Sequence, residues 1–144
     1  MKISQIKVVI ASHNLCGDYP IHKLAEVLES SCKLVALDLS DNEITDAGGE
    51  VLASSLAHNS SLKRLYLCDN KIGDGTGFYL QQVMKGNKTL GVLDLSGNYI
   101  KVSVVEMIQQ CVNTNKARTA ANLTGLYFLK KIYSKEILNN KAKV

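Results

Sequence analysis

The chain has 144 residues, of which 46% are hydrophobic and 21% charged, with one proline and a formal net charge of +4. This length suits a single domain, and this apolar content argues against intrinsic disorder. No apolar run is long enough to cross a bilayer, and the first residues lack the apolar centre of a signal peptide. We therefore expect a cytoplasmic protein without stable membrane insertion.

Residues 1–33 predict a weak strand followed by a helix. Pro20 suits the first turn of that helix, which we expect to run to about Ser31. The strand and the turn after it carry a pattern that returns later in the chain: Ile6, Val9, Ala11, Asn14 and Cys16. Terminal units of a repeating fold are commonly atypical, so this segment is interpreted as a degenerate first repeat.

The pattern becomes regular in the next three segments, where it returns every 28 residues as leucine, asparagine and isoleucine. The three sets are Leu34, Leu37, Leu39, Asn42 and Ile44; Leu62, Leu65, Leu67, Asn70 and Ile72; and Leu90, Leu93, Leu95, Asn98 and Ile100. Their alternation predicts half-buried strands with the leucines facing inward. The asparagines are predicted to satisfy backbone groups of the turn and to form a ladder between units.

The helices expected between these strands keep the same interval. Their inward positions are Leu24, Leu52, Leu80 and Ile108, each followed four residues later by Leu28, Leu56, Met84 and Val112. A spacing of four places both residues on one helix face, so strands and helices are predicted to share a core. Asp46 and Asp74 are predicted to be the N-caps of their helices.

The pattern Leu-x-x-Leu-x-Leu-x-x-Asn-x-Ile, followed by a helix after Asp46-Ala-Gly48, resembles the ribonuclease-inhibitor-like class of leucine-rich repeats. The resemblance covers roughly residues 6 to 115. It implies an α/β fold: a right-handed solenoid of about four 28-residue strand–helix repeats with a C-terminal cap. Residues 1–144 would form one domain, built from 1–33 and from repeats at 34–61, 62–89 and 90–117, with the cap at 118–144.

The last segment breaks the register, because Arg118 stands where a leucine is due. Two forms stay open for it. The favoured form is a fifth, capping strand followed by a helix from about residue 133 to 140. That strand would be carried by Leu123, Leu126 and Phe128. The other form is one long capping helix over 121–140.

Positive charge gathers at the C-terminal end, where residues 116–144 hold seven of the 17 Lys and Arg and one of the 13 Asp and Glu. The plainer interpretation is a solvated cap, and the sharper one is a patch for an acidic protein, a membrane or a nucleic acid. Few aromatic residues are interleaved with these charges, so we do not expect nucleic-acid binding.

Strand residues that point away from the core predict the binding surface, because the resemblance implies that partners dock on the concave sheet face. Tyr66 is expected between Asp38 and Asp94, with Arg64 nearby. Tyrosine and arginine are frequent hot spots, and aspartates suit a partner's Lys or Arg. The plainer interpretation is an ordinary solvated strand face. The predicted set is Ile10, His13, Asp38, Arg64, Tyr66, Cys68, Asp69 and Asp94, with Lys71 and Tyr99 as its rim.

No catalytic residue, metal site or cofactor site is predicted. His13, His22 and His58 pair with no nucleophile, and the glycines of 73–77 are followed by no lysine, as a phosphate loop would require. The four cysteines form no Cys-x-x-Cys pair, which indicates free thiols, a reducing compartment and no zinc site.

The predicted function is therefore protein binding through the concave sheet face, including inhibition or regulation of an enzyme whose active site is covered. The partner would be an enzyme, a host protein or a bacterial effector. Short free-standing repeat proteins of this kind resemble those that intracellular bacteria make, which would place the protein in host cytoplasm. The alternatives are a GTPase-activating-type or an actin-associated repeat protein.

Overall fold

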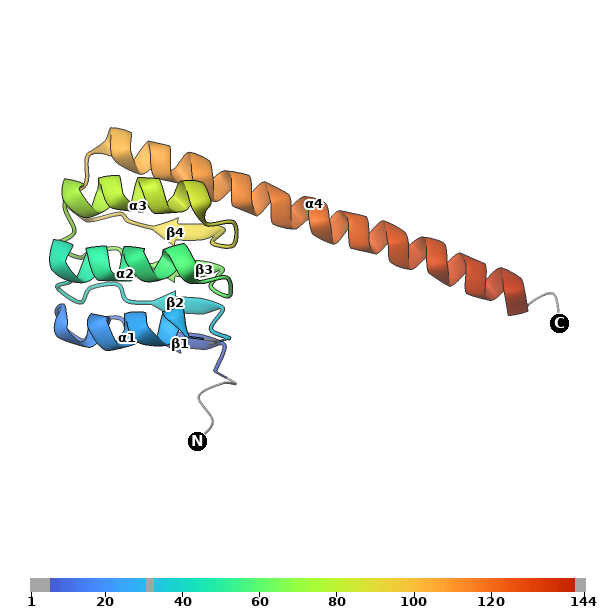
Figure 1. Cartoon of the computed structure of the whole chain (residues 1–144), viewed down its shortest axis with the longest axis horizontal. Helices are drawn as coiled ribbons and strands as arrows, with labels where there is room; N and C mark the ends of the chain where they lie inside the picture. Colours follow the sequence, from blue (N-terminus) through green and yellow to red (C-terminus); the bar gives the residue numbers. More distant parts are fainter. Residues whose placement is uncertain (1–5, 31–32, 142–144) are drawn as a thin grey trace.

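The computed structural model describes the backbone of residues 6–30 and 33–141 and the side chains of these ranges up to residue 123. Strands and helices alternate along the chain: β1 (Val8–Ile10), α1 (Tyr19–Glu29), β2 (Ala36–Asp38), α2 (Asp46–His58), β3 (Arg64–Tyr66), α3 (Asp74–Gly86), β4 (Val92–Asp94) and α4 (Val102–Lys141). Figure 1 shows these strand–helix units stacked in chain order, each helix lying next to the helix of the neighbouring unit. The predicted α/β class is confirmed.

The four strands form one parallel sheet in the order β1-β2-β3-β4. Leu37 pairs with Leu65 and Leu65 with Leu93, so the predicted 28-residue register holds across the sheet. Leu65 is fully buried, whereas the next residue, Tyr66, is half-exposed. The alternation predicted from the sequence therefore separates a core face from an open face.

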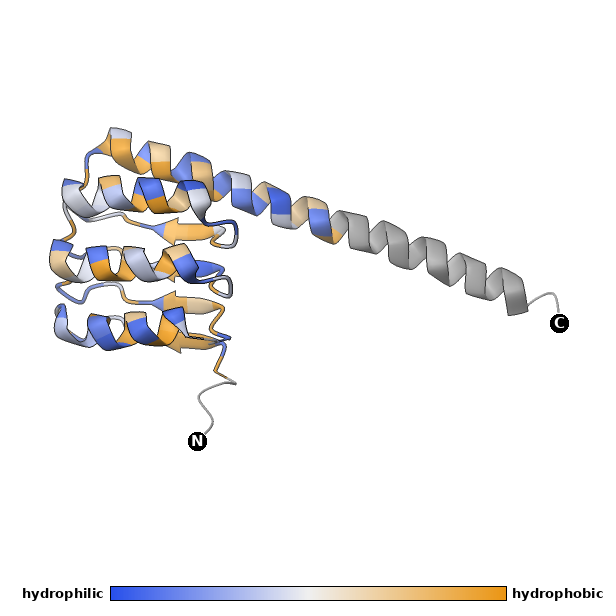
Figure 2. Ribbon diagram, viewed as in Figure 1, coloured by the Kyte–Doolittle hydropathy of each residue, from blue (hydrophilic) through white to orange (hydrophobic). Residues whose placement is uncertain are grey.

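The core lies between the sheet and the helices. The leucines of the strands and the apolar residues of the helices form a single buried cluster, with Ile6, Val9, Leu24 and Cys16 packed against it. Figure 2 shows hydrophobic residues along the strands and in alternation with hydrophilic ones around the helices. Full burial of a leucine contributes about 1.5–3 kcal/mol, so the repeated leucines dominate the stability of the stack.

The predicted asparagine ladder is present at the turns that follow the strands. Asn70 Nδ2 donates to Leu39 O at 3.0 Å, and Asn70 Oδ1 accepts from the backbone N–H groups of Asn42 (3.1 Å) and Ile44 (3.0 Å). Asn98 Nδ2 donates to Leu67 O at 2.8 Å in the same way. Each amide side chain thus joins its own unit to the one before it.

A second asparagine ladder, which sequence reasoning missed, runs along the opposite ends of the units. Asn59 and Asn87 are the C-caps of α2 and α3 and are buried. Asn87 Nδ2 donates to Leu56 O at 2.8 Å, and Asn87 Oδ1 accepts from the N–H of Leu90 at 2.9 Å. Asn115 continues the series: its Nδ2 donates to Asn87 O at 2.9 Å. This ladder could have been predicted from the sequence, because Asn59, Asn87 and Asn115 are spaced 28 residues apart.

The prediction that Asp46 and Asp74 are N-caps is wrong. The N-caps are Thr45 and Gly73, and each aspartate is the first residue of its helix. The carboxylates instead accept backbone N–H groups from the next unit: Asp46 from Gly73 at 2.9 Å, and Asp74 from Lys101 at 2.7 Å. The repeat interval explains the difference, because stacking brings an unsatisfied turn of the next unit within reach of each carboxylate.

The favoured prediction of a fifth strand in the last segment is also wrong. Residues 102–141 form one helix, α4, which includes the three apolar positions assigned to that strand. Figure 1 shows α4 continuing past the end of α3. Its sequence contains one glycine, Gly125, and no proline, and position 118 offers no leucine to draw the chain back into the core. Nothing in the local sequence therefore ends the helix.

Candidate protein-binding surface

The open sheet face has a central row in which Asp38, Tyr66 and Asp94 are paired neighbours on β2, β3 and β4. All three side chains are half-exposed. Neighbouring strands lie about 4.8 Å apart, so the phenol stands between two carboxylates. The structure thus brings these three predicted residues together as the register required.

Both aspartates of this row are partly occupied by the turns after their strands. Asp38 Oδ1 accepts the N–H of Ser40 at 3.0 Å. Asp94 Oδ1 accepts the N–H of Ser96 at 3.0 Å and its hydroxyl at 2.7 Å. Each bond uses one oxygen, so the carboxylates are held in place and each retains acceptor capacity.

A shallow depression of about 260 Å³ lies beside this row, where the chain leaves the strands. Its lining includes three predicted residues, Asp69, Lys71 and Tyr99. It also includes residues that sequence reasoning did not select, namely Leu15, Asp41, Glu43, Asn70 and Gly97. The 28-residue register could have identified them, because positions 15, 43, 71 and 99 are equivalent in successive units, and so are positions 41, 69 and 97.

Lys71 is held against the acidic wall of the depression. Its Nζ donates to Glu43 Oε1 at 2.9 Å, and both side chains are about half-exposed. This hydrogen bond raises the pKa of Lys71, and the charge of Glu43 adds to the effect. Because Lys71 is paired with Glu43, the two further carboxylates, Asp41 and Asp69, give the depression a net negative charge.

The turns that carry these acids have unusual backbone geometry. Asp41 and Asp69 have φ angles of +52° and +55°, and the equivalent Gly97 has +69°. Left-handed φ costs an ordinary residue about 1–2 kcal/mol, less for aspartate, whose short polar side chain bonds locally. His13, at the equivalent position of the first unit, has φ of +60° and its Nδ1 lies 2.7 Å from Asp41 Oδ2.

The remaining predicted residues do not line the depression. Ile10 is exposed on β1 and pairs with Asp38. Cys68 is half-exposed and its thiol donates to Ser40 Oγ at 3.0 Å. Arg64 is exposed at the start of β3 and lines a different groove, beside α4. The structure therefore divides the predicted set between the two ends of the strands.

Charge is divided in the same way. We call the part of the open face where the strands finish the strand-end side; its charged residues are Asp38, Asp41, Glu43, Asp69, Lys71 and Asp94, and it also carries His13. The part where β3 and β4 begin, the strand-start side, carries Lys63 and Arg64 and faces Lys116 of α4. A partner that contacts both sides has to present basic groups to one and acidic groups to the other.

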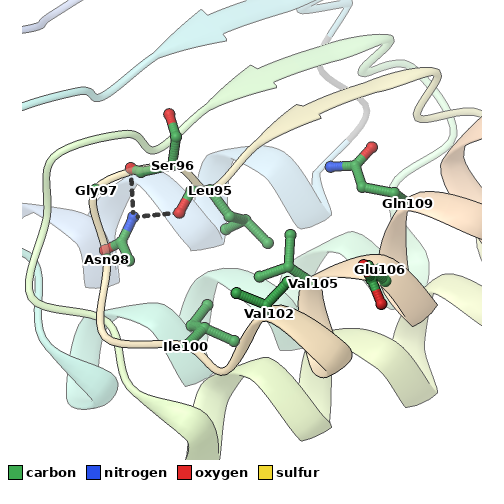
Figure 3. Close-up of a pocket in the computed structure, with 9 residues that line it drawn as sticks. All are labelled: Leu95, Ser96, Gly97, Asn98, Ile100, Val102, Val105, Glu106 and Gln109. Atoms are coloured by element: carbon green, nitrogen blue, oxygen red, sulfur yellow. Dashed lines mark hydrogen bonds between the residues drawn. The ribbon is translucent and has the colours of Figure 1, made fainter.

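The end of the stack holds another hollow, of about 350 Å³, between the turn after β4 and the first turns of α4 (Figure 3). Leu95, Ile100 and Val105 line it, and none of the residues predicted to bind a partner does. Gln109 reaches from α4 to donate its Nε2 to Leu93 O at 2.7 Å. This bond covers one carbonyl of the open edge of β4.

Other site types find no support in the described part of the chain. Over residues 6–30 and 33–123, no group of three or more His, Cys, Asp or Glu side chains is placed to hold a metal ion. Cys16, Cys68 and Cys111 are free thiols, and Cys32 lies outside the described residues. Within the described helices, none combines the length and hydrophobicity needed to span a bilayer.

Comparisons with known proteins agree with the repeat pattern. A family model described as "Leucine Rich repeat" matches residues 30–53 and 58–76, which supports a leucine-rich-repeat protein. No curated protein matches the sequence. One similar solved structure is the leiomodin-1 actin-binding site 2, with 12% identity and a TM-score of 0.70, covering 88% of this chain and 90% of that one.

A second similar structure is the C-terminal domain of a Caenorhabditis elegans tropomodulin. It shares 13% identity with a TM-score of 0.57, and the match covers 85% of this chain and 91% of that one. Identities this low show a shared fold alone. The two neighbours are not ribonuclease inhibitors, so they do not support the narrower class that the sequence pattern resembles.

Proposed function

We propose that this chain is a protein-binding module that docks a partner on the strand-end side of its open sheet face. The observation that carries the proposal is the row of Asp38, Tyr66 and Asp94, fixed on three paired strands beside the acidic depression. Rigid strands position such groups more precisely than loops do, and a tyrosine flanked by acids offers both contact area and charge.

The acids define the chemistry of the partner. Lysine or arginine side chains of the partner would meet the free acceptor sites of Asp38 and Asp94 and the carboxylates of the depression. Tyr99, which is 72% exposed, would cover the rim of that contact. A stable interface needs about 800 Å² per partner, which the four strands and their turns can supply together.

We also infer that the four strand–helix units are the repeats of a short right-handed solenoid, as the equal spacing of both asparagine ladders suggests. A module of this kind acts by occupying a surface. The narrower form of the proposal is that the module covers the active site of a partner enzyme and thereby inhibits that enzyme.

The test is affinity capture with mass spectrometry from cell extract, using the full chain and two variants, Tyr66→Ala and Asp38→Lys. We expect both variants to lose most of the main partner while keeping wild-type circular dichroism. The matched control is Lys23→Ala, which alters an exposed side chain on α1, away from the sheet. Unchanged recovery in both variants would exclude the strand-end side as the binding surface.

A second candidate function is association with actin. It is favoured by one observation, the fold shared with the leiomodin-1 domain whose description names an actin-binding site. Co-sedimentation with filamentous actin tests it directly: the chain should enter the pellet in proportion to actin concentration. If it stays in the supernatant at every concentration, this candidate is excluded and the general binding proposal is unaffected.

The GTPase-activating alternative gains no comparable support. The chain has two arginines, Arg64 on β3 and Arg118 on α4, and neither is on a loop that could reach a nucleotide. A GTP-hydrolysis assay with candidate small GTPases should show no acceleration.

A further inference from the structure

A groove of about 360 Å³ runs between the strand-start side of the sheet and α4. One wall comes from Arg64 and Val92, the first residues of β3 and β4, and the other from α4 around Thr119 and Leu123. The two walls lie close at one point, because an atom placed as a Cβ on Gly91 would be 3.8 Å from Lys116 Cα. The volume is at the lower end of the range for binding pockets, about 300–1,000 Å³.

The groove combines exposed apolar side chains with a group of cations. Leu123 is 62% exposed although it faces the groove, and Val92 is half-exposed. Lys63, Arg64 and Lys116 also line it, and no carboxylate does among the residues whose side chains the structure describes. Within the residues whose side chains are described, none of these three cations makes an ion pair.

This grouping sets the groove apart from the strand-end side of the sheet. There Lys71 is paired with Glu43, and the depression around it is lined by three carboxylates and one lysine. Lys101, at the start of α4, is likewise held 2.8 Å from Asp74. The groove therefore differs from the depression in both charge and apolar surface, so the two would recognise different ligands.

We propose that this groove binds an acidic peptide segment of a partner protein, with an apolar side chain inserted against Leu123 and Val92 and flanking carboxylates paired with Lys63, Arg64 and Lys116. Arginine binds a carboxylate through two parallel hydrogen bonds, so Arg64 fixes the direction of the segment, while the lysines act as point charges. The site is separate from the acidic depression and does not require that the depression be used.

The chemistry of the groove favours a peptide over other anions. Nucleic acids bind cationic grooves through aromatic side chains on which bases stack, and the described lining residues, which end at Leu123, include no aromatic residue. A membrane surface would meet a convex basic face, whereas these cations border a recess with an apolar wall. An apolar side chain with neighbouring carboxylates satisfies both features at once.

The experiment is a selection of random peptides displayed on phage, with the immobilised full chain as target. We expect the enriched sequences to share an apolar residue flanked by Asp or Glu. The enriched peptide, made synthetically with a fluorescent label, is then titrated with the protein by fluorescence anisotropy. Affinity should fall as salt is raised, because exposed charges are screened within about 10 Å at 0.1 M ionic strength.

Variants assign the binding to the groove. Lys63→Glu and Lys116→Glu should each weaken the peptide about two- to fivefold, the usual range for exposed ion pairs, and the double variant about tenfold or more. Leu123→Ser should weaken it about tenfold through lost apolar contact. The controls are Lys23→Glu, with the same change of net charge on α1, and Val102→Ser at the start of α4; both should bind as wild type does.

Three results would overturn the proposal: no enrichment, enriched peptides without acidic residues, or affinity that the groove variants leave unchanged. If no peptide is enriched, titration with anionic phosphatidylserine vesicles and with a single-stranded oligonucleotide identifies which other class of anion the groove binds. Tyr66→Ala and Asp38→Lys should leave peptide affinity unchanged, so failure of the groove is distinguishable from failure of the strand-end surface.

Discussion

Asn87 and Asn115 occupy equivalent places in successive units, yet the chain turns at the first and stays helical at the second. Both side-chain amides donate to backbone carbonyls: Asn87 to Leu56 O, and Asn115 to Asn87 O and Leu90 O. The difference lies in the residues beyond each asparagine. The Asn87 side chain accepts the N–H groups of Thr89 and Leu90, and Leu90 enters the core. Beyond Asn115 the next positions carry no leucine, and the helix continues.

The comparison shows that an asparagine at this position allows the helix to end but does not by itself end it. The turn forms when the chain beyond it has apolar residues to return to the core. The repeated part of the molecule, residues 34–100, meets this condition in every unit. α4 does not, and it becomes a long helix with an exposed side that forms a wall of the groove.

The largest effect should come from the shared core. Leu65→Ala should lower the free energy of unfolding by about 2–5 kcal/mol, because Leu65 is fully buried on a central strand. Leu123→Ala, which changes the same residue type on α4, should cost almost nothing. Urea denaturation followed by circular dichroism measures both. Similar losses would mean that this part of α4 belongs to the same core.

The two asparagines provide the next largest contrast. Asn87→Ala should cost about 1–3 kcal/mol, because it leaves buried carbonyl and N–H groups of two units without partners. Asn115→Ala should cost less, since alanine favours the helix that already passes through this position. The same denaturation experiment compares them. Equal losses would contradict the view that only Asn87 supports a turn.

The contacts that Asp46 makes with the next unit should contribute stability in a pH-dependent way. Burial alone would raise the pKa of Asp46, but hydrogen bonds from Thr76 and Gly73 outweigh it and hold the pKa below its usual value. The stabilisation should therefore be present above about pH 4, the usual pKa of aspartate, and be lost as pH falls through the lowered pKa. Asp46→Asn should cost about 1 kcal/mol at pH 7 and progressively less in acid.

A stability difference between Asp46→Asn and wild type that did not change with pH would contradict this explanation. Asp74→Asn is the matched variant next to α4. The pKa of Asp74 is lowered chiefly by hydrogen bonds from Lys101, whose side chain is exposed, so salt should weaken its contribution more.

Asp69→Gly separates stability from binding, because its effect on stability should be small. Glycine adopts the φ of +55° at this position without strain, and Gly97 already occupies the equivalent place in the last unit. We expect stability to stay within about 1 kcal/mol of wild type, because relief of strain is offset by greater freedom of the unfolded chain. Partner capture on the strand-end side should nevertheless fall. Full capture would remove Asp69 from the proposed surface.

The sequence was sufficient to predict the register, because leucine at 37, 65 and 93 leaves one arrangement in which all three are buried side by side. The same register placed Tyr66 on the open face and the first asparagine ladder in the turns. These features depend on residue type and interval alone. The pairing of β2, β3 and β4, the half-exposed side chain of Tyr66 and the hydrogen bonds of Asn70 and Asn98 confirm them.

Other features depend on contacts between units that no single unit reveals. Asp46 resembles an N-cap within its own segment, and its real partners, Gly73 and Thr76, belong to the next unit. The strand expected at 123–128 failed because its first leucine, Leu123, follows Asn115 by eight residues, whereas Leu90 follows Asn87 by three. The acidic depression also includes Asp41 and Glu43, which the sequence prediction did not select, so its shape required the stacked structure.

The equal interval of the two asparagine ladders has a consequence for how such a chain can change in length. Excision of residues 62–89 would bring Asn98 to the place of Asn70, where its amide could donate to Leu39 O. It would also bring Asn115 to the place of Asn87, where its amide could donate to Leu56 O. Duplication of the same segment would be equally compatible. Loss or gain of a number of residues that is not a multiple of 28 would leave the amides of one unit opposite the wrong acceptors of the next.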